Sequence, residues 1–278
     1  MVRITMQTKT FIGLMMLCLI GISFQVSAQE SHRWPEGKKA AVVLTYDDAI
    51  DCHLDIVVPA LDEHGFKGTF YLTGSSQSVA NRSDEWRAIA TNDHELANHT
   101  LFHPCRKVIP GERNFEWIRP EYDLDGYSFP QLMNELNTAN ALLRALDGKT
   151  ERTFAYTCVD HTIQGVDFSD SIQHIFVAAR GLSPVPETLK EVDPYLMPST
   201  SCSNLTGEQM IAEVKKAAAN GTVITFLFHS VGGGYLNTSA EAHQELLEYL
   251  KQNEDELWVD TFLNVTGHIK SEQERLGW

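Results

Sequence analysis

Strand-like and helix-like segments alternate along most of this chain, and this pattern limits its possible folds more than any other feature. Segment 40–46 (AAVVLTY) is a continuous apolar run, whereas 54–64 carries apolar residues at helical spacing and ends before a glycine. Further strand-like segments lie at 68–73, 95–98, 153–156, 175–179, 222–228 and 257–262, and further helical ones at 84–91, 129–146, 208–220 and 241–253. The alternation predicts one α/β domain, from about Trp34 to Val265, with a parallel sheet that is either open or closed into a barrel.

The first 28 residues have the pattern of an export signal. Two basic residues precede the apolar run 11–24, and the small residues Val-Ser-Ala at 26–28 follow as a cleavage site. The run has 14 residues, whereas a membrane-spanning helix needs about 20, so we do not expect a stable membrane anchor. We expect a signal peptide at 1–28, cleaved near Ala28, and a mature domain at 29–278 that is periplasmic or secreted.

The charge of the chain argues against one class of partner. The 278 residues include 22 Lys and Arg and 37 Asp and Glu, which gives a net charge of −15. Loss of the leader, with its two basic residues, would make the mature chain more acidic still. Binding to nucleic acid requires clustered cations that displace counterions from the phosphates. We therefore expect no nucleic-acid partner, and an uncharged ligand fits better.

The mature chain contains four cysteines, Cys52, Cys105, Cys158 and Cys202. An exported protein can keep disulfides, and four cysteines allow three complete pairings. The sequence does not select among these pairings, and free buried thiols are an equal alternative. It does not indicate the oligomeric state either.

Two of the three polar clusters each contain residues that could bind a metal. Asp47 and Asp48 follow the strand-like segment 40–46, and α/β folds place their sites at such strand ends. Because the backbone turns there, both carboxylates can enter one cleft, although paired aspartates at strand ends are also common as helix caps. His99 and His103 are four residues apart, so in a helical turn both imidazoles would reach the same cation.

The third cluster is suited to proton transfer. His229 ends the strand-like segment 222–228 and precedes the glycine run 232–234. A histidine beside a flexible backbone can donate or accept a proton near a ligand. Ser230 could instead be a nucleophile, but a hydrolase elbow requires glycine two residues earlier, where this chain has Phe228.

Together the three clusters resemble the motifs of the polysaccharide deacetylases of carbohydrate esterase family 4, whose domain is also called the NodB-homology domain. Thr45-Tyr46-Asp47-Asp48 is similar to the family's first motif, T-F-D-D. The segment from His99 to His103 is similar to its second motif, H-[S/T]-x-x-H, and 227–229 is similar to its fifth, L-x-H. The resemblance covers about 39–262. It implies a distorted (β/α) barrel of seven or eight parallel strands.

The resemblance also implies an activity and a role for each of these residues. The activity is hydrolysis of N- or O-acetyl groups from a poly- or oligosaccharide. Asp47 would be the general base, His229 the general acid, and Leu227 part of the pocket for the acetyl methyl group. A divalent metal would be held by Asp48, His99 and His103. One carboxylate and two imidazoles suit zinc, with cobalt or nickel as alternatives. Thr100 would steady the segment that carries both histidines.

This chain departs from the family pattern at the third and fourth motifs. The third is usually F-R-P-P-Y, but here Phe154 is followed by Ala-Tyr-Thr-Cys, so the arginine that supports the catalytic aspartate is missing. The segment resembles a family variant, F-A-Y-P, in which Cys158 would offer the oxyanion N–H. We hypothesise that Arg180 supplies the missing charge, and we group it with Leu227 and Cys158 as substrate-binding residues; an ordinary surface arginine is the alternative. The fourth motif has no clear match, and Asp193 only marks its place.

Two questions remain open at this stage. The altered third motif leaves a second function possible, a catalytically silent or specialised relative that binds glycan. The long segment 100–127, which contains several prolines, also supplies the aromatic residues Trp117, Tyr122 and Tyr127. Together with Tyr235 they could stack on sugar rings, or they could equally belong to the core.

Overall fold

The structure is a computed structural model that describes residues 1–2 and 34–278. The predicted export signal therefore lies outside the described residues, apart from its first two positions. The architecture below concerns residues 34–278.

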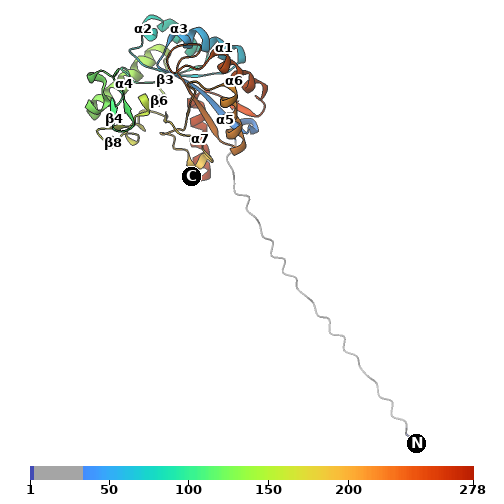
Figure 1. The fold of residues 1–278 in the computed structure, drawn as a ribbon. Helices are drawn as coiled ribbons and strands as arrows, with labels where there is room; N and C mark the ends of the chain where they lie inside the picture. Colours follow the sequence, from blue (N-terminus) through green and yellow to red (C-terminus); the bar gives the residue numbers. More distant parts are fainter. Residues whose placement is uncertain (3–33) are drawn as a thin grey trace. The chain divides into compact units, whose positions relative to one another are not determined.

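A parallel sheet forms the centre of the fold (Figure 1). Seven strands follow the order β10-β11-β1-β2-β3-β6-β9, and β12 pairs with the first half of β1. The strands are β1 Ala40–Asp47, β2 Thr69–Leu72, β3 Glu95–Asn98, β6 Thr153–Ala155, β9 Ala178–Arg180, β10 Thr200–Ser201, β11 Val223–Phe228 and β12 Leu257–Val259. All residues of β1 and β11 are buried, as expected for parallel strands with both faces covered.

The sheet curves into an incomplete barrel. Its edge strands β9 and β10 are not paired with each other, and only the isolated bridges Arg180–Met197 and Ser183–Ser199 lie near this edge. The expected distorted (β/α) barrel of seven or eight parallel strands is confirmed.

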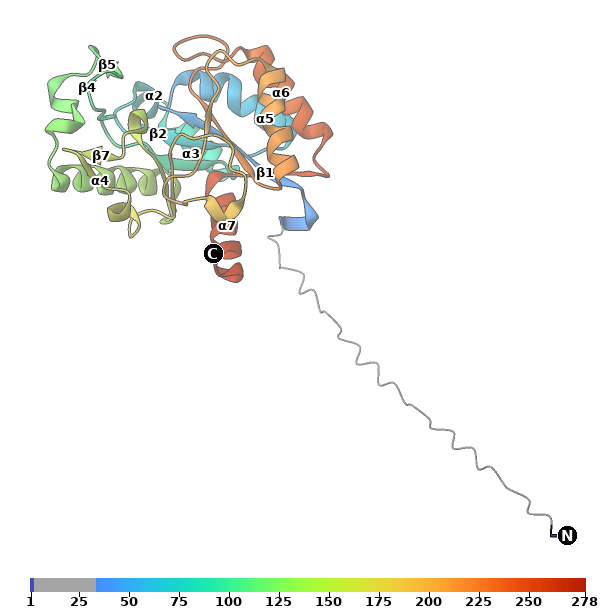
Figure 2. The ribbon, with the colours of Figure 1, turned by 60° about the horizontal axis from the view of Figure 1, so that its bottom comes forward.

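Helices cover the sheet, and their ends follow local sequence signals. They are α1 Val58–His64, α2 Gln77–Asn81, α3 Ser83–Thr91, α4 Phe129–Asp147, α5 Gly207–Asn220, α6 Ala240–Gln252 and α7 Phe262–Leu276, and a π-helical turn, His53–Val57, precedes α1. Thr206 and Gln209 form a capping box at the start of α5, and Gly221 ends that helix in the left-handed conformation. Figure 2 shows α5 and α6 side by side at one end of the sheet and α4 at the other.

The C-terminal segment differs from the prediction. The expected strand 257–262 ends at Val259, and Thr261 caps the unpredicted helix α7. The side chains of Phe262, Val265 and Ile269 recur at helical spacing and are buried, so the domain continues past its predicted end at Val265. The strand predicted at 175–179 is also displaced, because Phe176 belongs to a turn and β9 begins at Ala178.

Short elements fill the connections around one end of the sheet. The hairpin β4 Val108–Ile109 with β5 Arg113–Asn114 arises from the long segment 100–127, and β7 Thr162–Ile163 pairs with β8 Val166–Asp167. In Figure 2, β4 and β5 lie at the end of the domain far from α5 and α6. Six 3-10 turns complete the list: Pro35–Gly37, Pro120–Tyr122, Leu124–Gly126, Thr157–Val159, Asp170–Ile172 and Leu189–Glu191.

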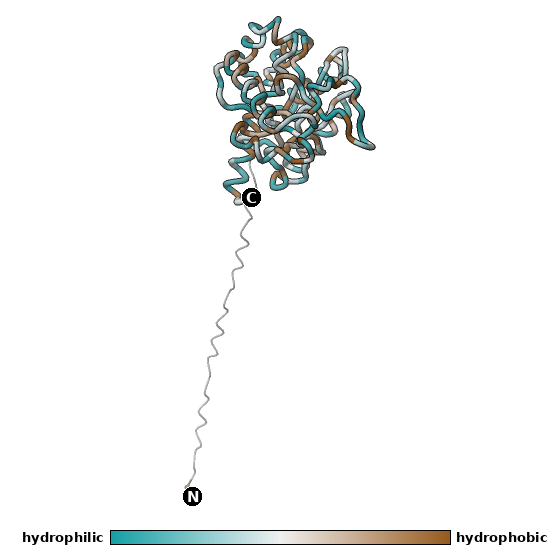
Figure 3. Tube along the Cα trace, turned by 90° about the vertical axis from the view of Figure 1, so that its left-hand side faces the viewer, coloured by the Kyte–Doolittle hydropathy of each residue, from teal (hydrophilic) through white to brown (hydrophobic). Residues whose placement is uncertain are grey.

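Hydrophobic and hydrophilic residues alternate along the described trace (Figure 3). Within the described part of the chain, no helix combines the length and the apolar character needed to cross a membrane.

Candidate metal-binding active site

The predicted site residues meet at the carboxyl ends of the parallel strands. A cleft of about 950 Å³ lies there, and six of the eight predicted residues line it: Asp48, His99, His103, Cys158, Leu227 and His229. The two others, Asp47 and Arg180, do not line the cleft and are buried.

Asp47 is held by a buried arginine. The Arg180 guanidinium donates from Nη1 to Asp47 Oδ1 at 2.8 Å and from Nη2 to Oδ2 at 2.5 Å, and Nη1 also donates to Thr45 Oγ1 at 2.7 Å. Burial alone would raise the pKa of Asp47, but the charge and the hydrogen bonds of Arg180 outweigh it and hold the pKa below its usual value. Asp47 is therefore kept ionised and fixed in orientation.

The position of Arg180 argues against its predicted substrate-binding role and supports the hypothesis that it supplies the missing positive charge. Arg180 is the last residue of β9 and its side chain is 1% exposed, so it does not belong with the substrate-binding residues. Its bidentate contact is the one expected of a residue that supplies the missing positive charge. Arg152 lies at the other end of β6, just before Thr153, and pairs with Asp147.

Asp48 enters the cleft because the backbone turns sharply after β1. Asp48 and Ala49 both have left-handed backbones, with φ of 79° and 52°, and the Asp48 N–H donates to the carbonyl of Tyr71 at 3.0 Å. Adjacent side chains on a strand face opposite ways, so this turn is what lets two neighbouring carboxylates serve one site.

His99 and His103 converge, but not through the helical turn that their spacing suggested. His99 directly follows β3, and left-handed backbones at Thr100 and His103, with φ of 63° and 55°, bend the chain instead. Thr100 Oγ1 accepts the N–H of His103 at 2.9 Å, and Glu135 accepts the N–H groups of the two residues between them. The imidazole rings lie 4.9 Å apart between centroids. Side-chain acceptors thus replace the missing helical hydrogen bonds.

The donor atoms of Asp48, His99 and His103 fit a metal ion. Asp48 Oδ1 lies 3.4 Å from Nε2 of His99 and 3.2 Å from Nε2 of His103, and all three donor atoms lie within 4.8 Å of one another. This oxygen is buried and accepts no hydrogen bond, a costly state that a cation would relieve. Burial would raise the pKa of Asp48, but the two imidazoles hold it well below its usual range. Asp48 in turn raises the pKa of His103 against the opposing effect of burial.

The hydrogen bond on the far side of the His99 ring also favours a metal-binding role for this residue. Its Nδ1 lies 2.9 Å from the carbonyl oxygen of Ala155, so Nδ1 carries the proton and Nε2 presents its lone pair toward Asp48. Histidines that bind metals usually have such an acceptor behind them.

His229 lines the same cleft and lies beside Asp48. Its Nε2 is 3.8 Å from Asp48 Oδ2, and burial lowers its pKa although Asp47 and Asp48 partly oppose this. Leu227, on the same strand end, lines the cleft as predicted. Asp193, which only marked the place of the fourth motif, is exposed and accepts the N–H of Tyr195. Its contact is therefore local to a turn.

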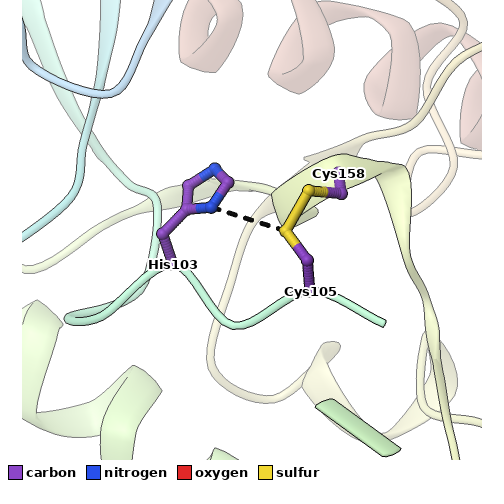
Figure 4. A group of neighbouring side chains, drawn as sticks. All are labelled: His103, Cys105 and Cys158. Carbon is purple, nitrogen blue, oxygen red and sulfur yellow. Dashed lines mark hydrogen bonds between the residues drawn. A yellow bond between two sulfur atoms is a disulfide. The ribbon is translucent and has the colours of Figure 1, made fainter. Parts of the chain in front are cut away.

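The cysteines form one disulfide among the described residues. Cys105 is bonded to Cys158, and Cys52 and Cys202 are free. Figure 4 shows the bridge beside His103, whose Nδ1 lies 3.4 Å from the Cys105 sulfur. Although His103 and the two sulfurs are close enough to hold an ion, the sulfurs are bonded to each other and offer no thiolates.

The aromatic candidates divide into two groups. Trp117, Tyr122 and Tyr235 line the cleft, and Trp117 is 61% exposed. Tyr127 is buried and donates its hydroxyl to Glu135 at 3.0 Å, so it belongs to the core. Ser230 is also buried and does not line the cleft, which removes the geometric basis for its role as a nucleophile.

Comparison with known proteins agrees with this geometry. Residues 35–163 match the family model described as polysaccharide deacetylase. This part of the chain is a polysaccharide deacetylase domain. The matched segment contains Asp47, Asp48, His99, His103 and Cys158, and the same sheet continues beyond it to β11, which ends just before His229.

Solved structures show the same deacetylase fold. A protein from Mycobacterium smegmatis, assigned as a polysaccharide deacetylase, aligns with a TM-score of 0.62 at 18% identity over 87% of this chain and 94% of its own. A family 4 acetyl xylan esterase from Clostridium thermocellum, in complex with a cobalt ion, aligns with a TM-score of 0.53 at 20% identity over 83% and 92%.

A curated relative is much longer than this chain. A gellan lyase from a Bacillus species is 23% identical over 273 residues, which cover 87% of this chain and 10% of that protein. The chain therefore spans about a tenth of the length of this relative.

Sequence reasoning missed several supporting residues of the deacetylase domain. Tyr235 donates its hydroxyl to Asp48 Oδ2 at 2.6 Å, a contact that no spacing rule could indicate. Thr45 lies within the first motif, and its position two residues before Asp47 on a strand was a usable signal, because such residues share a face. Glu135 and Asp160 reach the site from α4 and from the turn after β6, and neither has a sequence pattern that marks it.

Proposed function

We propose that this chain is a metal-dependent hydrolase that removes acetyl groups from a poly- or oligosaccharide. One observation carries the proposal. A buried carboxylate oxygen of Asp48 without a hydrogen bond faces the Nε2 atoms of His99 and His103, beside a second carboxylate that a buried arginine keeps ionised.

Asp48, His99 and His103 would hold the metal. Two imidazoles and one carboxylate suit zinc, with cobalt and nickel as alternatives, and the cobalt ion named for the Clostridium thermocellum esterase is consistent with this choice. When bound, such an ion polarises a carbonyl and lowers the pKa of water.

The remaining residues provide the proton transfers. Asp47, ionised and oriented by Arg180, accepts the proton of the attacking water. His229, whose Nε2 lies 3.8 Å from Asp48 Oδ2, donates a proton to the departing amine or alcohol. The backbone N–H of Cys158 stabilises the developing oxyanion, and Leu227 packs on the acetyl methyl group. The apolar, aromatic lining suits a neutral carbohydrate, and we further propose that the enzyme acts after export.

The test measures acetate release by the mature chain from a panel of N-acetylated and O-acetylated glycans. We expect a chelator to abolish release and zinc, cobalt or nickel to restore it, and we expect Asp47→Asn to lower it by at least about 100-fold. The matched control is Asp84→Asn, since the Asp84 side chain is 93% exposed and outside the cleft. Release that resists chelation, or equal rates for the two variants, would contradict the proposal.

A second candidate is a glycan-binding protein without turnover. The absence of arginine from the third motif and the exposed Trp117 favour it. Tight binding to glycans of the same panel, with no acetate released at any metal concentration, would establish this function instead.

A further inference from the structure

We propose that the Cys105–Cys158 disulfide is a positioning element of the site, which holds His103 and the backbone of Cys158 as one unit. Metal affinity and turnover would then both depend on the oxidised pair. This inference rests on the proposed function, because it concerns the placement of two groups that the proposed reaction uses.

The first argument is the contact between the bridge and His103. A disulfide sulfur carries no proton, so at 3.4 Å the Nδ1–H of His103 donates to the Cys105 sulfur (Figure 4). This arrangement leaves Nε2 facing Asp48 Oδ1. In His99 the Nδ1–H donates instead to the main-chain carbonyl of Ala155 at 2.9 Å, which likewise leaves Nε2 facing Asp48. The sulfur therefore orients the loop histidine as the carbonyl orients the strand histidine.

The second argument is the backbone at the other end of the bridge. Cys158 and Val159 have φ of 52° and 57°, a left-handed conformation that is costly for residues with side chains. Something must hold this turn in place, and the disulfide anchors it at its centre. Arg113 adds a contact from Nη2 to the Cys158 carbonyl at 3.2 Å. The direction of the Cys158 N–H is thus tied to the segment that carries His103.

The third argument is that other contacts join the same two segments. Buried Asp160 accepts the N–H of Arg106 at 2.8 Å and Nη1 of Arg113 at 2.7 Å. The Thr157 hydroxyl donates to the carbonyl of Pro104. These contacts would keep the segments together without the bridge, so its loss should loosen the site while the domain stays folded.

The experiment compares Cys105→Ser/Cys158→Ser with the parent and with Cys52→Ser, which removes a free thiol outside the cleft lining. We measure cobalt binding by calorimetry, kcat and KM for acetate release, and the melting temperature. We expect the dissociation constant for cobalt to rise at least tenfold and kcat to fall at least tenfold in the double variant, with KM changed less than threefold. Cys52→Ser should match the parent.

A bridge that only stabilises the fold would give a different result. In that case the melting temperature would fall, but the cobalt dissociation constant and kcat measured well below it would stay within twofold of the parent, and this outcome overturns the inference. A parent that neither binds cobalt nor releases acetate would instead refute the proposed function, so the two failures are distinguishable.

A second measurement covers a double variant that fails to fold. A phosphine reduces the bridge in the folded parent: two thiols form with hydrogens from water, and the phosphine takes up the oxygen. We expect the same tenfold losses while near-ultraviolet circular dichroism stays native. Unchanged cobalt affinity and turnover after complete reduction would overturn the inference.

Discussion

The site has two halves that differ in how their side chains are held. The sheet-borne half consists of residues that end strands or directly follow them: Asp47, Asp48, His99, Arg180 and His229. The loop-borne half consists of His103, Cys158 and Tyr235. The side chains of Asp47 and His99 are 3% and 2% exposed, whereas that of His103 is 21% exposed.

The difference shows what each half contributes. Asp47 and His99 are fixed by a buried guanidinium and a strand carbonyl, so the sheet sets the position of the site. His103 and Tyr235 reach the Asp48 carboxylate from loops. The ring of His103 contacts the disulfide, and Tyr235 reaches Asp48 through its hydroxyl alone. The loops complete a proposed metal-binding group whose first residues the sheet already orients.

The strongest test of this division compares His99→Ala with His103→Ala. Each variant removes a proposed metal ligand. Cobalt affinity and acetate release should therefore both fall by more than about 100-fold, which exceeds the cost of losing an outer contact. Only His99→Ala leaves the Ala155 carbonyl without its side-chain donor, and it should also lower the free energy of unfolding by about 1–3 kcal/mol. Calorimetry and urea unfolding measure the two effects. Equal stability of the variants would show that the halves do not differ.

A second test removes the buried cation. Arg180→Met leaves the Asp47 carboxylate unpaired, so the free energy of unfolding should fall by about 3–5 kcal/mol and kcat by at least roughly tenfold. Arg82→Met is the control, because Arg82 makes only surface ion pairs, which are worth about 1 kcal/mol or less. An unchanged kcat in Arg180→Met would refute the role assigned to Arg180.

A third prediction concerns acid stability on the sheet side. His243 is buried, its Nε2 lies 2.8 Å from the Tyr46 hydroxyl oxygen, and burial lowers its pKa from 6.5 to about 3. The unfolded chain therefore binds a proton that the folded chain does not as pH falls from 6.5 toward 3. This histidine's contribution to stability is complete above pH 6.5 and decreases below it, by about 2 kcal/mol between pH 7 and 5.

His243→Asn, whose amide can both donate to and accept from the Tyr46 hydroxyl, should lose less stability than the parent over that pH range. Urea unfolding at pH 7, 6 and 5 measures the difference. Parallel losses in the two proteins would mean that His243 does not contribute to acid sensitivity.

The smallest expected effect belongs to the loop side. Trp117 is 61% exposed and its ring lies 6.2 Å from that of His103, so Trp117→Ala should raise KM a few-fold by removing a stacking surface. Stability should change by no more than about 0.5 kcal/mol. Val166→Ala, which is exposed and outside the cleft lining, should leave KM unchanged. A KM shift of equal size in both variants would contradict a stacking role.

The sheet-borne half could be predicted from the sequence far better than the loop-borne half. Parallel strands end at one edge of a sheet, so recognising the strands before Asp48, His99 and His229 was enough to bring them together. The contact between Arg180 and Asp47 was a hypothesis of the same kind, since both lie at strand ends.

The loop-borne half depends on backbone conformations that periodicity does not encode. Left-handed residues at Thr100 and His103 replaced the expected helical turn, and three cysteine pairings were equal until the fold brought Cys105 to Cys158. The strand expected through Phe262 failed for a different reason, because the segment 257–262 contains both the end of β12 and, at Thr261, the cap that starts α7.

The glycine at position 234 shows how a missing side chain can shape a site. A β-carbon there would lie 2.5 Å from the Ser230 hydroxyl and 3.0 Å from its β-carbon, and φ of 117° excludes most other residues. The next residue is Tyr235, whose hydroxyl reaches Asp48. Any larger residue at 234 would clash with Ser230 and strain the backbone that precedes Tyr235. The absence of a side chain at 234 therefore lets this turn adopt the conformation from which the tyrosine hydroxyl reaches Asp48.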